Sequence, residues 1–365
     1  MSTHTVFIVN PTSGRGAGLI ASSELKGLAA NAGLDYQITL TNGVGHATQL
    51  AQEAATQGAQ IVVAVGGDGT ANEVLNGLMQ ARQAGVGQAA LGVIGVGRGN
   101  DFAFGMGVQA GLAVGFQNLT QGTRKPMDVG FVSGGLYPQG RYFGNGVGIG
   151  FDAVVGFEAA KLKRLHGFLN YLVAALRTMF LYYHAPLVQL DFNGQSRTMP
   201  ALMVSVMNGR RMGGGFMMAP EGSMEDGEFT CCLVQQVSRP AILALIPKFM
   251  QGTQGAHPAV RRHARRLPRR LLGGREPVRG RRGGCDVRGA HVRDHGLLPP
   301  LLLAPHVQDL ACRPVRICGT RRLGRAAWPD LVGRPPPPSP RALRQGGRRP
   351  LPEAARVRLV AHGRV

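Results

Sequence analysis

The residues best suited to chemistry follow a short apolar run at 61–65 and read Gly66-Gly67-Asp68-Gly69-Thr70-Ala71-Asn72. Glycines let the backbone approach a phosphate with no Cβ in the way. The first turn of a following helix adds unpaired N–H groups and a positive dipole end. A carboxylate at Asp68 would repel a phosphate unless a metal ion lay between them. The string therefore predicts a binding site for a magnesium nucleotide. The alternative is a tight strand–helix turn in which Asp68 caps the helix.

Strands that alternate with helices must position this string. Apolar runs predict buried strands, and helical spacing of apolar residues predicts helices between them. This order favours a parallel sheet with helices on both faces, in which ligands bind beyond the carboxyl ends of the strands. The predicted strands are 5–9, 36–41, 61–65 and 90–95, and the predicted helices are 19–30, 46–56 and 74–84.

Two further polar loops reach the same edge of the predicted sheet. One is Asn10-Pro11-Thr12-Ser13-Gly14, after the first strand, and the other is Gly95-Val96-Gly97-Arg98-Gly99-Asn100-Asp101, after the fourth. The first has neither the ending of a P-loop nor a dinucleotide-binding glycine pattern. Asn10, Ser13 and Asp101 could merely cap helices. Their arrival at the edge that holds Asp68 favours one shared site.

Length and composition limit the number of domains, the charge distribution and the cellular location that the chain can have. The 365 residues suffice for two domains. The net charge of +21 lies almost wholly in residues 261–365, which hold 25 Arg, no Lys and 6 acidic residues. The five cysteines (231, 232, 285, 312 and 318) show no paired metal spacing and favour a reduced, cytoplasmic protein. Neither a signal peptide nor a transmembrane helix is expected.

The motifs, in this order, resemble the diacylglycerol kinase catalytic-domain superfamily, which includes bacterial lipid kinases and sphingosine kinases. The matching pieces are the loop at 10–14, the string at 66–77, and the segments 99–103, 128–130, 148–153 and 208–220. Two residues depart from the family pattern. Gly95 stands where the family commonly has proline, and Arg98 where it has threonine, although Arg98 could still meet a phosphate as a cation.

The resemblance implies an α/β ATP-binding domain over residues 1–126 and a mostly antiparallel, β-rich lipid-substrate domain over 127–260, with the active site between them. It implies transfer of the γ-phosphate of ATP to a lipid hydroxyl, such as that of diacylglycerol, with Mg²⁺. Asp68 and Asp101 would be catalytic. The nucleotide contacts would be Asn10, Pro11, Thr12, Ser13, Gly14, Thr41, Gly66, Gly67, Asp68, Gly69, Thr70, Ala71, Asn72 and Arg98.

A second, structural metal site is implied by the resemblance at residues 223–228. Asp226 would be the carboxylate ligand, and the backbone carbonyls of Ser223 and Glu228 would complete the site. An acidic hairpin turn with no metal remains the alternative.

One long helical pattern, over 155–183, interrupts the strands of the second domain. Its first half is basic, with Lys161, Lys163, Arg164 and His166, and its second half is largely apolar. This order fits a segment that lies on an anionic membrane and admits a lipid, which predicts a peripheral location. The alternative is a helix that packs in the core. A homodimer is left open, and no specific nucleic-acid partner is expected.

Residues 261–365 differ from the rest of the chain. They contain no Lys, Phe, Tyr, Met or Asn and hold 14 of the 23 prolines. Such a segment buries little apolar surface and is expected to be disordered. An arginine-rich nucleic-acid tail is one alternative, but out-of-frame translation that begins near 254–262 fits the composition best. The resemblance also implies a late Asp-Gly-Glu, whose glutamate acts as general base. That element is missing here, so weak or absent activity is expected.

Other kinases of the same superfold, such as NAD kinases and phosphofructokinases, also use a Gly-Gly-Asp-Gly motif. The Asn10-Pro11 loop and the string Gly99-Asn100-Asp101-Phe102-Ala103 argue against them. A non-enzymatic nucleic-acid binder that acts through the arginine tail is the other rival.

Overall fold

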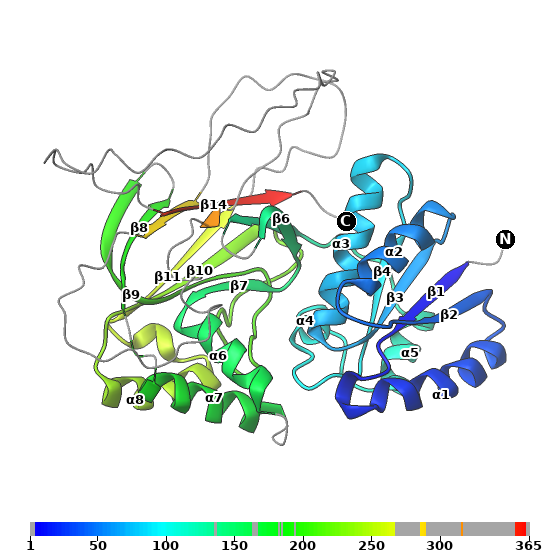
Figure 1. Ribbon diagram of the computed structural model, residues 1–365, viewed down its shortest axis with the longest axis horizontal. Coiled ribbons are helices and arrows are strands. Elements are labelled where there is room, and N and C mark those ends of the chain that lie inside the picture. The colour runs from blue at the N-terminus through cyan, green and yellow to red at the C-terminus, as the bar shows by residue number, and fades with distance from the viewer. Residues whose placement is uncertain are drawn as a thin grey trace, which may run out of the picture.

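The computed structural model describes residues 4–134, 137–162, 167–181, 183, 185–192 and 195–266, together with short strands at 285–289, 315–316 and 355–362. The described elements form two domains (Figure 1). Lys163, Arg164, His166 and most of residues 261–365 lie outside the described residues, so the expectations for them stay predictions. None of the described helices has the length and apolar character needed to cross a bilayer.

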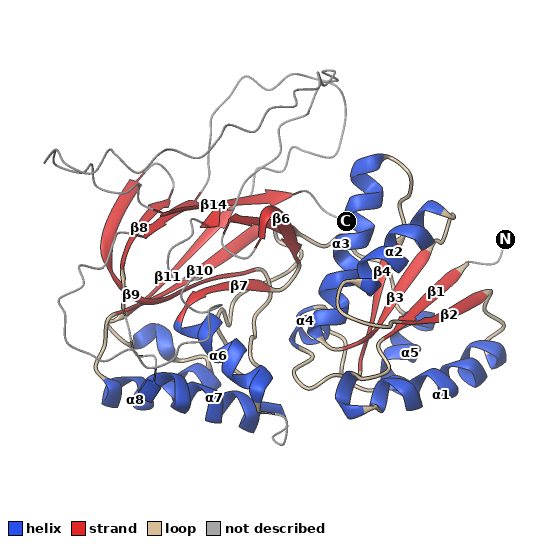
Figure 2. Ribbon diagram, viewed as in Figure 1, coloured by secondary structure: helices blue, strands red, loops and turns tan. Residues whose placement is uncertain are grey.

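The first domain is a parallel sheet in the order β2-β1-β3-β4, with helices on both faces (Figure 2). Helices α2 and α3 pack on one face, and α1 and α5 pack on the other. The predicted α/β architecture is therefore confirmed. The strands are β1 (Thr5–Val9), β2 (Tyr36–Leu40), β3 (Ile61–Gly66) and β4 (Ala90–Gly95), and the helices are α1 (Ala17–Asn31), α2 (His46–Thr56), α3 (Asp68–Ala84), α4 (Asp101–Gly105) and α5 (Leu112–Gln121), with a single 3₁₀ turn at Ser13–Arg15.

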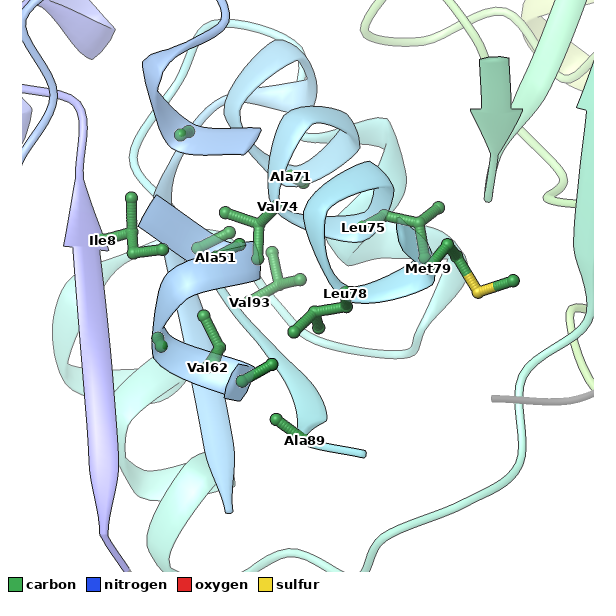
Figure 3. Packing of buried hydrophobic residues seen from close by; sticks show 14 of the residues in the cluster. Ile8, Ala51, Val62, Ala71, Val74, Leu75, Leu78, Met79, Ala89 and Val93 are labelled. Atoms are coloured by element: carbon green, nitrogen blue, oxygen red, sulfur yellow. The ribbon is translucent and has the colours of Figure 1, made fainter. Parts of the chain in front are cut away.

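Helix α3 is shared between the two domains. Val74 and Leu78 face the sheet and α2, whereas Leu75 and Met79 project from the other side of the helix (Figure 3). The same buried cluster includes Val129, Tyr142 and Met224 of the second domain. The helix that begins at the Gly-Gly-Asp-Gly string therefore also packs against the second domain.

The second domain is an antiparallel sheet flanked by helices α6, α7 and α8. The predicted β-rich domain is confirmed. Its strands are β5 (Val129–Gly134), β6 (Tyr137–Phe143), β7 (Gly146–Gly150), β8 (Leu187–Phe192), β9 (Gln195–Met207), β10 (Glu228–Gln235), β11 (Val260–Arg266), β12 (Cys285–Gly289), β13 (Val315–Arg316) and β14 (Ala355–His362), and its helices are α6 (Phe151–Lys161), α7 (Gly167–Leu181) and α8 (Arg239–Gln251), followed by a 3₁₀ turn at Gln254–Ala256.

The prediction of one long helix over 155–183 is wrong, because the segment forms two helices, α6 and α7. The backbone of Leu162 leaves the helical conformation (ψ 76°), which ends α6. The buried side chain of Asn170, on α7, then donates a hydrogen bond of 3.0 Å to the Ala159 carbonyl near the end of α6. This contact satisfies one of the last carbonyls of α6 and joins the two helices.

Asp152, in the first turn of α6, predicts a pH-dependent stability. Its carboxylate accepts hydrogen bonds from the Ala153 N–H (2.9 Å) and the Ser205 hydroxyl, and burial raises its pKa to about 6 from 3.8. Between these values the folded state binds more protons than the unfolded state, so this group lowers the stability as the pH rises, by about 3 kcal/mol in total.

Asp152→Asn is therefore expected to flatten the pH dependence of the free energy of unfolding between pH 4 and 7. It should also stabilise the protein at pH 8. Urea unfolding at several pH values measures this, with Asp35→Asn as the control because Asp35 is exposed and pairs with His4. An unchanged pH slope in Asp152→Asn would contradict the assignment.

Asn76, buried on α3, fastens the first domain to β6. Its Nδ2 donates to the Tyr142 carbonyl (2.9 Å), and its Oδ1 accepts from the Tyr142 N–H (2.9 Å). Asn76→Ala is expected to cost about 1–3 kcal/mol, because these buried backbone groups lose a partner. Denaturant unfolding measures the loss, and Asn118→Ala, on the exposed side of α5, should change the stability by less than about 0.5 kcal/mol. Equal effects of the two variants would refute the role of Asn76.

Candidate active site

A cavity of about 880 Å³ lies between the two domains, at the carboxyl edge of the parallel sheet. Three loops of the first domain, which follow β1, β3 and β4, supply most of its wall. The second domain supplies the opposite side from α6 and α7. The lining residues are Asn10, Thr12, Ser13, Gly14, Arg15, Gly67, Asp68, Gly69, Thr70, Gly97, Arg98, Gly99, Ala160 and Tyr171. The shared site predicted for the three loops is therefore present.

Two glycines allow these loops to pack backbone against backbone. A Cβ on Gly97 would lie 2.3 Å from the Cα of Gly67. Gly14 has a φ of +56°, and a Cβ there would lie 2.2 Å from the Val96 carbonyl oxygen. Neither position has room for a side chain, so glycine is required for the loops to meet.

Asp68 is the first residue of α3, and Gly67 is the N-cap. The alternative that Asp68 caps this helix is wrong. Its Oδ1 instead accepts a hydrogen bond from the Phe102 N–H (2.8 Å), which joins the loop after β3 to the start of α4. Burial, and then the negative charge of Asp101, raise the pKa of the Asp68 carboxyl. Both carboxylates border Gly99, where a Cβ would lie 2.8 Å from Asp68 Oδ2 and 3.4 Å from Asp101 Oδ2.

Asp101 is buried and links α4 to the second domain. Its alternative role as a helix cap is wrong, because the N-cap of α4 is Asn100. The Asp101 Oδ1 accepts from Arg211 Nε (2.7 Å), and its Oδ2 accepts from the Gly214 N–H (2.7 Å). The Arg211 guanidinium also lies 4.0 Å from the centroid of the Phe104 ring. Sequence reasoning missed Arg211, because an arginine 110 residues from its partner leaves no signal in the spacing.

Asn10 joins the first loop to the start of α3. Its Nδ2 donates to the Thr70 hydroxyl (3.1 Å), and its Oδ1 accepts from the N–H (3.1 Å) and the hydroxyl (2.9 Å) of Thr12. The alternative that Asn10 or Ser13 caps α1 is wrong, since the N-cap of that helix is Gly16, with no side-chain bond. Asn10 instead fixes two of the three loops relative to each other.

Several residues predicted to contact the nucleotide do not line the cavity. Asn72 points to the second domain, where its Nδ2 donates to the Tyr142 carbonyl (2.9 Å) and its Oδ1 accepts from Arg141 Nε (2.7 Å). Ala71 is part of the core. Pro11, Thr41 and Gly66 also lie outside the lining. Gly97 and Gly99 line it from the loop after β4, as expected, whereas Arg15, Ala160 and Tyr171 are lining residues that the sequence did not indicate.

The predicted metal loop is held by its own hydrogen bonds. Asp226 Oδ1 accepts from the Glu228 N–H (2.8 Å), and the Ser223 hydroxyl accepts from the Glu225 N–H (3.2 Å). Burial raises the pKa of the Asp226 carboxyl, and the charges of Glu228 and Asp128 raise it further. In the described part of the chain no three His, Cys, Asp or Glu side chains gather as a metal site. A metal ion here would need the backbone carbonyls, so the assignment stays a prediction.

Comparisons with known proteins match both domains. Residues 4–132 match the family model of the diacylglycerol kinase catalytic domain, and residues 145–269 match that of the YegS C-terminal NAD kinase beta sandwich-like domain. The second match, like β11, continues past residue 260, where the family pattern was expected to end.

Proteins named diacylglycerol kinase and proteins named YegS-like lipid kinase are similar to this chain. A "Diacylglycerol kinase" of Bacillus subtilis (strain 168) is 28% identical over 247 residues, which cover 67% of this chain and 78% of that protein. A "Probable lipid kinase YegS-like" of Chromohalobacter salexigens is 31% identical over 225 residues, which cover 61% and 69%. A crystal structure of a diacylglycerol kinase from Bacillus anthracis str. Sterne shares the fold, with a TM-score of 0.57, 22% identity and coverage of 79% of this chain and 88% of that one. The two domain matches and these relatives together show that the chain belongs to the diacylglycerol kinase catalytic-domain superfamily of lipid kinases.

Proposed function

We propose that this protein transfers the γ-phosphoryl group of ATP to the hydroxyl of a diacylglycerol-like lipid at a membrane surface. The observation that carries the proposal is the convergence of three glycine-bearing loops and Asp68 on one cavity whose opposite wall is formed by α6 and α7. The other kinases of this superfold remain rivals that a choice of acceptors can separate.

The first domain fits the phosphates of a nucleotide. The backbone at the start of α3 offers N–H groups beside Gly67 and Gly69, which can approach an anion closely. Ser13 adds a hydroxyl donor and Arg98 adds a cation, whereas the Thr12 hydroxyl already donates to Asn10 Oδ1. This set of donors suits a chain of phosphate groups, because each donor can face a different oxygen.

Asp68 fits a magnesium ion. Burial and the negative charge of Asp101 destabilise the ionised carboxylate of Asp68, as its raised pKa shows. A divalent cation beside Asp68 would offset this cost, and oxygen atoms are the ligands that Mg²⁺ prefers. When bound, Mg²⁺ with ATP supplies the phosphoryl group and neutralises charge on it. The Asp68 carboxylate would hold the cation and help to orient the acceptor hydroxyl.

The second domain offers an apolar surface for the lipid. Leu169 and Leu181 on α7, and Leu243 on α8, are roughly half exposed, and Phe180 is 66% exposed. Helices α7 and α8 lie side by side along one edge of the domain (Figure 2). Exposed apolar side chains on neighbouring helices suit contact with a membrane, from which the acceptor would enter the cavity.

The proposal can be tested with purified protein, MgATP and a coupled assay for ADP. The acceptors to compare are diacylglycerol in vesicles, a sphingoid base, NAD and fructose 6-phosphate. Diacylglycerol is expected to stimulate ADP release most. The rate is expected to be about 10²–10⁴-fold below the ~1–100 s⁻¹ of ordinary kinases, because the late Asp-Gly-Glu base is missing. Stimulation by NAD or the sugar phosphate instead would refute the proposal, and a full kinase rate would refute the argument about the base.

A further inference from the structure

Tyr171, on α7, is the polar side chain that the second domain contributes to the cavity. Among the described lining residues, the second domain supplies only Tyr171 and Ala160. Within the described part of the chain, the Tyr171 hydroxyl has no hydrogen-bond partner. A partly buried hydroxyl in a cavity with no protein partner is available to a ligand.

Tyr171 lines the same cavity as the charged side chains of Asp68 and Arg98 on the glycine loops. Burial, followed by the negative charges of Asp68 and Asp101, raises the pKa of this phenol, and the positive charge of Arg98 lowers it. The phenol is therefore protonated at neutral pH. It can donate a hydrogen bond across the cavity, toward the loops that follow β3 and β4.

The ring of Tyr171 lies beside a loop that Asp101 holds. Gly213 has a φ of +67°, and a Cβ at Gly213 would lie 3.4 Å from the Tyr171 ring. The next residue, Gly214, donates its N–H to Asp101 Oδ2 (2.7 Å). Asp101 thus fixes the backbone that lies beside the ring, although its own side chain does not line the cavity.

We infer that the Tyr171 hydroxyl donates a hydrogen bond to the γ-phosphate of MgATP from the wall opposite the glycine loops, and that Asp101 is a positioning residue that holds the ring there through Gly213 and Gly214. This inference rests on the proposed function, because it needs a nucleoside triphosphate in the cavity. The first domain has its own donors for the phosphates beside its loops. A donor on the facing wall adds selectivity for a third phosphate.

Calorimetric titration of the full chain with MgATP and MgADP tests this inference without turnover. Tyr171→Phe is expected to lower the ratio of the ATP and ADP affinities about 10-fold, the effect of one hydrogen bond to a charged group. Tyr183→Phe is the matched control, since it removes a hydroxyl that donates to the Val237 carbonyl outside the cavity, and it should leave the ratio unchanged. Melting temperatures establish that the variants fold.

The same titration tests the role of Asp101 with a separate variant. Asp101→Asn should lower the ATP/ADP ratio, and combining it with Tyr171→Phe should lower the ratio no further, because both act on one hydrogen bond. An unchanged ratio in Tyr171→Phe, or an equal loss of affinity for both nucleotides, would overturn the inference and leave the proposed function standing. Wild-type protein that binds no MgATP would overturn both.

Discussion

Replacing Asp68 with asparagine is expected to lower the rate of lipid phosphorylation by at least about 10²-fold, because the charge that holds the cation beside the reacting phosphate is lost. The fold should tolerate the change. The asparagine Oδ1 can still accept the Phe102 N–H, which now bonds Asp68 at 2.8 Å. Transfer of ³²P from labelled ATP into lipid measures the rate.

The stability of Asp68→Asn is expected to stay equal or to rise. Burial and Asp101 raise the pKa of Asp68, so at neutral pH its ionised form costs free energy in the folded state. Function and stability would then move in opposite directions, as is common at active sites. Asp35→Asn, at an exposed carboxylate, should change neither property. An active Asp68→Asn enzyme would contradict the role of Asp68 in holding the cation, and a loss of several kcal/mol of stability would show that Asp68 serves the fold.

Replacing Arg211 with methionine is expected to lower the free energy of unfolding by about 3–5 kcal/mol, because it leaves the buried Asp101 carboxylate without its cation. The Arg211 Nε lies 2.7 Å from Asp101 Oδ1, and the second carboxylate of the site, Asp68, lies nearby. Methionine keeps an apolar stem over the Phe104 ring, so the missing charge dominates the effect. Denaturant unfolding gives the free energy.

A double variant separates the lost pairing from lost packing. Asp101→Asn combined with Arg211→Met removes both charges and should recover most of the stability that Arg211→Met loses. Lys125→Met is the control, because Lys125 and Glu225 form an exposed ion pair (3.3 Å) that should contribute less than about 1 kcal/mol. If the double variant were no more stable than Arg211→Met alone, the buried pair would not explain the cost.

The first domain could be predicted from the sequence because its signals are local. Strands β1, β3 and β4 are largely apolar runs, and parallel strands present their carboxyl ends at one edge, which brings the loops at 10–14 and 95–101 to Asp68. The second domain gave weaker signals. Strand β7 has glycine at three of its five positions, so no alternation of apolar and polar residues marks it. The break between α6 and α7 involves Asn170, which reaches back to Ala159 only in the folded chain.

The part of the site that the first domain forms could be predicted from the sequence, whereas the part that the second domain forms could not. Tyr171 lines the cavity and Arg211 pairs with Asp101, both from segments more than 100 residues beyond Asp68 along the chain, and no spacing links them to the site. The predicted contacts Ala71 and Asn72 failed to reach the cavity for a geometric reason. Helix α3 begins at Asp68, so successive residues turn by about 100° and point to the core and to the second domain.

The most direct test of the lipid kinase activity follows the γ- and the α-phosphate of ATP separately. The full chain is incubated with diacylglycerol vesicles, Mg²⁺ and ATP labelled with ³²P at either the γ- or the α-position, and the lipid is extracted. Label from the γ-position is predicted to enter the lipid slowly, and label from the α-position is predicted to stay in the water phase. ADP release with no labelled lipid, or label in the lipid from the α-position, would contradict transfer of the γ-phosphoryl group from ATP to a lipid hydroxyl.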